Sequence, residues 1–132
     1  MRIALILVPA LALLATACAT SPEQIAARDA SQAKMVPAAT PAGAPESCVI
    51  TRNIQSTKVR NDSVIDFEMN GGKIYRNTLP LSCPGLGFEE RFAYKTSIGQ
   101  LCSVDTITVL RQGIDGPTCG LGTFQPVKMA DN

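Results

Sequence analysis

Cysteine is the residue type with the widest choice of chemistry in this chain, because a thiolate can form a disulfide, bind a metal or attack a substrate. Four of the five cysteines fall after residue 47: Cys48, Cys83, Cys102 and Cys119. No two have the Cys-x-x-Cys spacing, so the pattern indicates neither a zinc knuckle nor a thioredoxin-like redox site. We therefore predict two structural disulfides. Of the three possible connectivities we favour Cys83–Cys119 with Cys48–Cys102, because Cys83 and Cys119 would both lie at the open end of one predicted hairpin.

Arg76 is the charged residue whose placement matters most. In the hairpin register that we predict, it lies opposite Ile65 on the core side of the sheet. A buried arginine needs a carboxylate, and Glu90 or Asp105 could supply it, so we predict a buried ion pair. An anion-binding role for Arg76 is the alternative. Glu89 and Glu90 would face opposite sides of a strand, which indicates a solvated edge or a local ion pair rather than a catalytic pair.

Histidine is absent from the whole sequence. Its absence excludes Ser-His-Asp and Cys-His nucleophile systems and histidine metal sites. Two glycine-rich stretches, Gly85-Leu86-Gly87 and Gly120-Leu121-Gly122, lack the lysine and the following helix of a phosphate loop, so we expect turn glycines. We predict no catalytic residue, no cofactor and no metal site, although an enzyme that works through carboxylates remains an alternative.

The charge balance also limits the partners. Residues 1–17 contain one charged residue, Arg2, out of 12 Lys+Arg and 11 Asp+Glu, so the rest of the chain has 11 of each sign. A formal charge of zero provides no basic field for nucleic acid. We therefore predict no nucleic-acid partner.

Residues 1–17 have the pattern of a signal peptide. Arg2 precedes a run from Ile3 to Ala15 that has no charged residue. As a helix this run would span about 20 Å, which is less than the bilayer core of about 30 Å. A charged start, a short apolar stretch and small residues after it are typical of export signals.

The segment Leu14-Ala15-Thr16-Ala17-Cys18 resembles the lipobox of bacterial lipoproteins. The resemblance implies that the mature chain begins at Cys18 with two acyl chains on its sulfur, which anchor a protein stably in a membrane. Ala19, because it is not aspartate, implies the outer membrane by the same resemblance. Ordinary signal cleavage, which would leave a soluble periplasmic protein, is the alternative. If Cys18 carries lipid, an even number of cysteines remains for disulfides in the oxidising periplasm.

The elements that must position these residues divide the mature chain in two. Residues 18–47 contain the lipidated cysteine and an Ala/Pro-rich flexible tether, with a possible short helix over Pro22–Lys34. Residues 48–132 form one small β domain. Its size is marginal for a single core, so disulfides would help to stabilise it.

The domain reads as five or six antiparallel strands in a compact sheet or partial barrel. We expect a hairpin in which Asn70-Gly71 forms a two-residue loop, with Glu68 opposite Lys73 and Phe67 opposite Ile74. A Gly71-Gly72 loop would shift this register. The remaining expected strands and loops are these: strands over residues 57–60, 63–69, 88–96, 101–110 and 123–127, and a loop over residues 113–118.

The stretch from Gly71 to Leu110, with Cys48 before it and Cys119 after it, contains four motifs in order: GGKIYRNTLP, CPGLGFEERFAY, LCSVDTITVL and CGLGTF. It resembles a family of small bacterial secreted or lipoprotein domains of unknown function. The resemblance implies export and a four-cysteine framework. It carries no activity or ligand.

We expect a non-enzymatic envelope module, anchored in the outer membrane and facing the periplasm. Its β domain would bind an envelope protein or polymer, or support an assembly. The alternatives are a carboxylate-dependent periplasmic enzyme and a small-ligand-binding domain.

Overall fold

The residues from Val64 to Met69 form an interior strand of the largest sheet in a computed structural model that describes residues 21–96 and 98–130. Ile65 and Phe67 point into the core and are fully buried. The strand pairs with one neighbour on each side. The sheet has the order β1-β10-β5-β4-β3, and all its pairs are antiparallel. Its strands are β1 (Ala39–Pro41), β3 (Ile54–Val59), β4 (Val64–Met69), β5 (Ile74–Thr78) and β10 (Phe124–Met129).

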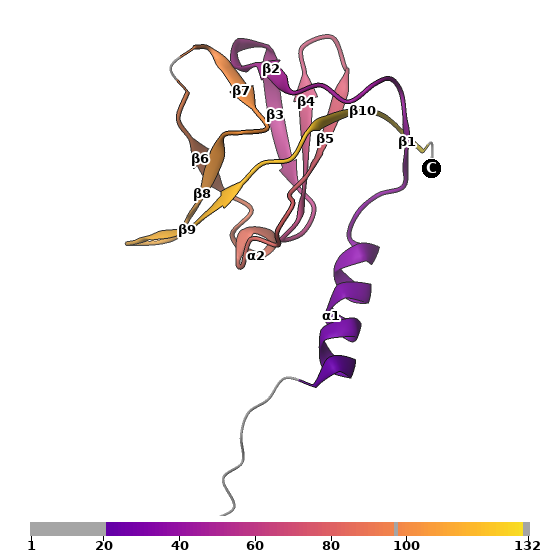
Figure 1. Cartoon of the computed structure of the whole chain (residues 1–132), viewed down its shortest axis with the longest axis vertical. Coiled ribbons are helices and arrows are strands. Elements are labelled where there is room, and N and C mark those ends of the chain that lie inside the picture. Colours follow the sequence, from indigo (N-terminus) through magenta and orange to yellow (C-terminus); the bar gives the residue numbers. More distant parts are fainter. Residues whose placement is uncertain (1–20, 97, 131–132) are drawn as a thin grey trace, which may run out of the picture.

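Two smaller sheets complete the β domain (Figure 1). One has two strands, β2 and β7, and the other has three, in the order β6-β8-β9. The predicted class, a small mainly β fold with antiparallel pairing and disulfides, is confirmed, and the sheets remain separate within the described residues. The elements are β2 (Cys48–Ile50), the 3-10 helix η1 (Thr51–Asn53), α2 (Leu86–Glu89), β6 (Phe92–Tyr94), β7 (Gln100–Cys102), β8 (Thr106–Leu110) and β9 (Asp115–Gly120).

The core lies where these sheets face one another. Phe67 meets Phe124 and Phe92 edge-on, with ring centroids 5.3 and 6.3 Å apart, a preferred geometry for aromatic pairs. Aliphatic residues from the smaller sheets and from α2 fill the rest: Val49, Leu86, Leu101, Ile107, Val109 and Leu121.

Helix α1 (Pro22–Lys34) has the predicted bounds. Ser21 accepts a hydrogen bond from the Gln24 backbone N–H and Gln24 bonds back to Ser21, which makes a capping box. The helix buries no residue and extends below the strands in Figure 1. Gln32, near its end, bonds to the turn between β3 and β4 through Asn61 and Asp62.

The ordered sheet begins earlier than the expected domain boundary at Cys48. β1 comes from the segment interpreted as a tether, and it pairs with β10 through the register Ala39↔Met129 to Pro41↔Val127. Glu46 forms a further antiparallel bridge with Phe124. The sheet therefore uses chain from the Ala/Pro-rich segment as an edge strand, where Pro41 is tolerated because an edge needs fewer backbone donors.

The predicted register of the β4–β5 hairpin is wrong. Three residues, Asn70 to Gly72, form the turn, because the Met69 N–H donates to the Lys73 carbonyl at 2.8 Å. Both glycines have positive φ, 92° and 89°, which L side chains rarely adopt. Phe67 therefore lies opposite Tyr75, and Glu68 lies opposite Ile74.

Three other expected elements differ from the structure. The expected strand over 88–96 begins instead as α2, which leaves Phe88 87% exposed, and only Phe92–Tyr94 is extended. The expected strand over 101–110 is split by a turn, because the Asp105 carboxylate accepts from the Cys102 N–H and the Asp105 N–H donates to the Cys102 carbonyl. The expected loop over 113–118 contains most of β9, an edge strand that accommodates Gly116 and Pro117.

Candidate binding cleft

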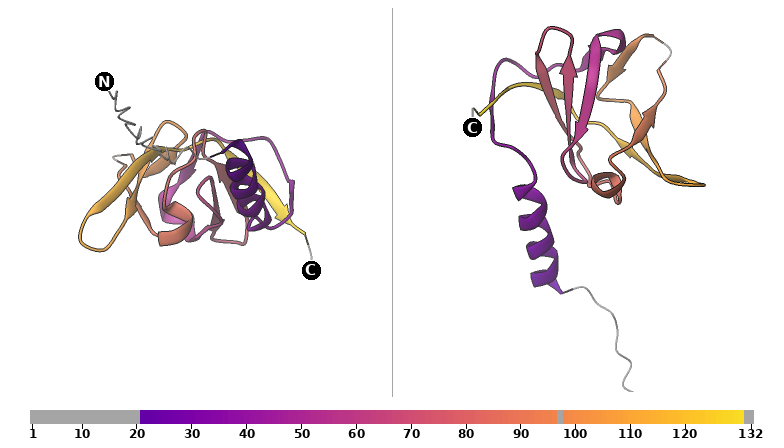
Figure 2. Two further views of the ribbon diagram at one scale, coloured as in Figure 1. Left: turned by 90° about the horizontal axis from the view of Figure 1, so that it is seen from below. Right: turned by 180° about the vertical axis from the view of Figure 1, so that it is seen from behind.

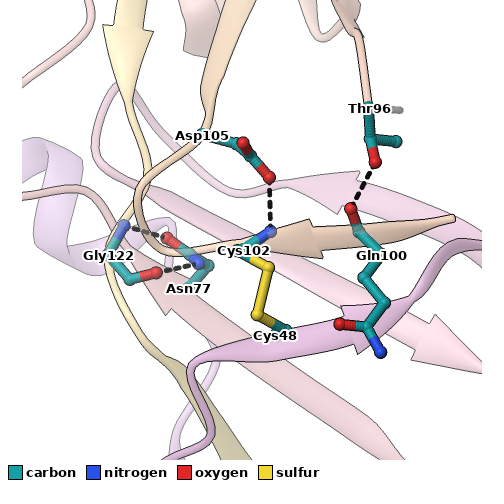
Figure 3. Close-up of a disulfide and its surroundings, with 7 residues drawn as sticks. All are labelled: Cys48, Asn77, Thr96, Gln100, Cys102, Asp105 and Gly122. Atoms are coloured by element: carbon teal, nitrogen blue, oxygen red, sulfur yellow. Dashed lines mark hydrogen bonds between the residues drawn. A yellow bond between two sulfur atoms is a disulfide. The ribbon is translucent and has the colours of Figure 1, made fainter. Parts of the chain in front are cut away.

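Both predicted disulfides are present. Cys48 and Cys102 lie directly opposite each other in β2 and β7 and are bonded, as Figure 3 shows. Cys83, which precedes α2, is bonded to Cys119 in β9. The predicted lipid anchor, Cys18, lies outside the described residues.

The predicted partners of Arg76 are wrong. Arg76 binds Asp66, with Nε 2.8 Å from Oδ1 and Nη2 3.0 Å from Oδ2, and does not pair with Glu90 or Asp105. The three-residue turn sets a register in which Arg76 lies opposite Asp66 rather than Ile65. Asp105 instead holds the turn after β7, and Glu90 ends α2 with φ 53°.

Asp66 joins two arginines. Arg60 Nε also donates to Asp66 Oδ2 at 2.8 Å, and the Asp66 side chain is 1% exposed. Burial alone would raise the pKa of Asp66, but the hydrogen bonds from Arg76 and Arg60 outweigh it and hold the pKa below its usual value. Asp66 is not among the site residues predicted from the sequence. The sequence signal that could have identified Asp66 as a buried ion-pair partner is the pair of arginines around it. Arg60 follows the preceding strand, and Arg76 lies in the next strand.

The Gly120-Leu121-Gly122 stretch has a packing role that a turn glycine does not explain. The Asn77 side chain, fully buried, donates to the Gly122 carbonyl at 2.7 Å and accepts from the Gly122 N–H at 2.8 Å (Figure 3). A Cβ on Gly122 would lie 2.1 Å from the Thr78 carbonyl oxygen. Only glycine lets the two backbones approach this closely.

The feature best suited to bind a partner is the cleft between β3 and β6, which we call the seam. β3 ends the five-stranded sheet and β6 ends the three-stranded sheet, so each has an unpaired side within the described residues. Figures 1 and 2 show the two sheets beside each other. The cleft holds about 430 Å³ and is lined by Ile54 and Thr57 from β3, Phe92 and Tyr94 from β6, and Leu110 at the end of β8.

The backbone of β3 directs polar groups into the seam. The Arg60 N–H donates to the Val64 carbonyl, and hydrogen-bonded pairs alternate along an antiparallel ladder. Lys58 and Ser56 therefore bond to β4, while the N–H and C=O groups of Thr57 point away from it. The hydrogen bonds of β4 are consistent with this assignment, because Met69 bonds on the side of the other neighbouring strand, β5.

The backbone of β6 does the same from the other wall. The Leu110 N–H donates to the Arg91 carbonyl at 3.0 Å. By the same alternation, Ala93 bonds to β8, and the backbone groups of Phe92 and Tyr94 point away from it. The seam therefore has hydrogen-bonding groups on both walls and partly buried apolar side chains between them.

Charged residues stand at one end of the seam. Glu90 and Arg91 line it, and Arg91 Nη2 lies 3.8 Å from Glu89 Oε2. This local ion pair matches the expectation for the Glu-Glu-Arg sequence. The pair is exposed on the Arg91 side, so its contribution to stability is small.

Residues 21–96 and 98–130 contain no group of three or more potential metal-ligating Cys, Asp or Glu side chains. Within the same ranges no helix combines the length and apolar character needed to cross a bilayer.

Comparison with known proteins found no matching family model, no matching curated protein and no matching solved structure.

Proposed function

We propose that this protein is a bacterial envelope lipoprotein whose β domain is a non-enzymatic binding module. Cys18 would carry the lipid anchor in the outer membrane, and the domain would face the periplasm. The seam between β3 and β6 would be its binding surface, and an envelope protein or polymer its partner.

The observation that carries the proposal is how the cysteines are used. The two disulfides engage four of the five cysteines. Disulfides persist in oxidising compartments such as the periplasm. The fifth cysteine, Cys18, is the one that the lipobox-like segment would lipidate, so the disulfides and the N-terminal sequence support the same compartment.

The non-enzymatic part of the proposal rests on the site. Asp66, the most deeply buried carboxylate among the described residues, is held ionised by two arginines that bond to both its oxygens, so it is poorly suited to act as a general acid or base near neutral pH. The seam, by contrast, offers mainly backbone groups and apolar side chains, with the charged Glu90 and Arg91 at one end.

The test separates anchoring from folding. Cys18→Ser should move the protein from the membrane fraction to the soluble periplasm. It should also impair function in a strain in which deletion of the gene for this protein has a measurable phenotype. Ala19→Ser, which keeps the cysteine, should change neither. Mass spectrometry of the mature N-terminus should find a diacylated Cys18. An unmodified N-terminus would contradict the anchor.

A further inference from the structure

We propose that the seam binds an extended segment of a partner protein as an added β-strand between β3 and β6. The inference rests on the proposed function and names the class of partner. It commits to a polypeptide and not to a polysaccharide or a lipid.

Complementarity of the backbone charges is the main argument. The outward N–H and C=O groups of Thr57 on one wall and of Phe92 and Tyr94 on the other carry alternating partial positive and negative charges. A polypeptide in extended conformation presents the matching alternation on both of its sides. Strand addition to an exposed sheet edge is an established mode of peptide recognition.

The side chains of the seam define which peptide fits. Successive residues of a strand point to opposite faces. On one face the added strand would meet Ile54, Phe92 and Tyr94, which are partly buried against the core. On the other it would lie beside Ser56 and Lys58, whose side chains bond to Glu68. A peptide that alternates apolar and polar residues therefore fits best.

A second copy of this chain is disfavoured as the partner. β6 has only three residues, and β3 has a register shift near Ile54 and a lysine at position 58. Short edges, bulges and lysine are the features that disfavour edge-to-edge pairing of identical sheets. β10 is separated from β3 by two strands and β1 by three, and both are already paired within the five-stranded sheet.

The experiment uses defined peptides and the oxidised full-length protein. The probes are capped seven-residue peptides in which Val or Phe alternates with Ser or Lys. The comparison peptides have the same composition with the apolar residues grouped together. Alternating peptides should bind with Kd values below about 1 mM and shift the amide resonances of β3 and β6, and grouped peptides should bind at least tenfold more weakly.

Proline substitution tests the backbone contact. Thr57→Pro removes an N–H that points into the seam and leaves the bonds to β4 intact, as proline is tolerated on an open edge. It should weaken binding about tenfold. Ala39→Pro is the matched control on the opposite edge, where the Ala42 N–H bonds to Pro126 and alternation directs the Ala39 N–H outward. Binding should stay within about twofold of the unsubstituted protein.

N-methylated peptides test the same contact should Thr57→Pro impair folding. One alternating set of peptide amides would face β3 and the other β6, so methylation of either set should abolish binding. Binding that survives methylation of either set would overturn the two-edged insertion, as would failure of every alternating peptide to bind. Either result would leave the proposed lipid anchor standing, since Cys18→Ser and mass spectrometry of the N-terminus test it separately.

Discussion

The five-stranded sheet and the two smaller sheets are stabilised in different ways. No cysteine lies in the five-stranded sheet, whereas all four disulfide cysteines lie in the smaller sheets or in the loop before α2. β3, β4 and β5 pair over five residues or more. The ion-paired group of Asp66, Arg60 and Arg76, which we call the Asp66 triad, links this part of the sheet. β2 and β7 pair over three residues, which is marginal without further support.

The difference shows where a small domain needs covalent bonds. A long hairpin ladder with a buried aromatic face is stabilised by its own hydrogen bonds and packing. Short strands that pair across long stretches of chain must first overcome the entropy of loop closure, which a disulfide reduces in the unfolded state. The two disulfides therefore stabilise the smaller sheets, including the short β2–β7 pair.

Removal of both disulfides should have the largest effect. Each is expected to contribute roughly 2–4 kcal/mol, a large share of the stability of so small a domain. After reduction, hydrogen exchange should accelerate first in β2, β7 and β9, and last in β4 and β5. The oxidised protein in the same buffer is the control. Equal loss of protection in all the sheets would remove the distinction between the regions.

Asp66→Asn should be the most damaging single change in the five-stranded sheet. It leaves two partly buried arginines without a counter-ion, which should cost about 3–5 kcal/mol. Glu68→Gln is the control, because Glu68 is 28% exposed and pairs with an exposed Lys58. It should cost less than about 1 kcal/mol. Urea unfolding measures both, and equal losses would mean that the triad does not support the sheet.

Acid should weaken the same triad. The pKa of Asp66 is lowered in the folded protein, so its contribution is fully present above its unfolded pKa of about 4. It is lost as the pH falls through the lower folded pKa. The stability difference between the unsubstituted protein and Asp66→Asn should therefore shrink below about pH 4. Urea midpoints from pH 2 to 7 that run parallel for the two proteins would contradict this sign.

Gly122→Ala should have a smaller effect that spans the two regions. Its Cβ would lie 2.1 Å from the Thr78 carbonyl oxygen and would disturb the Asn77 bonds, at a cost of about 1–3 kcal/mol. Gly120→Ala is the control, since no atom lies within 4 Å of its Cβ position. Thermal unfolding should separate the two variants. If Gly120→Ala were the more destabilising change, close approach would not explain the glycine at position 122.

Sequence reasoning succeeded where one local signal determines the structure. The Ser-Pro-Glu-Gln start predicts α1, and apolar alternation predicts the position of β4. The disulfide pairing also followed, because only the order of the strands was needed. These predictions required no knowledge of exact register.

Sequence reasoning failed where distant contacts decide between local options. The turn at Gly71 and Gly72 has three residues rather than the predicted two. Arg76 therefore lies opposite Asp66 rather than Ile65, and the ion pair was predicted with the wrong carboxylates. The Asp105 side chain interrupts a run rich in β-formers by bonding the Cys102 N–H. The seam could not be predicted, because it depends on which strands end each sheet, and that order comes from tertiary packing.

The open edge of β3 is the central claim, and residue-resolved hydrogen exchange of the peptide-free protein tests it most directly. The Lys58 amide, bonded to β4, should be strongly protected, while the exposed Thr57 amide beside it should exchange at least tenfold faster. Added alternating peptide should slow Thr57 and leave Lys58 unchanged. If Thr57 is protected as strongly as Lys58 without peptide, the seam is already closed and strand addition at β3 is contradicted.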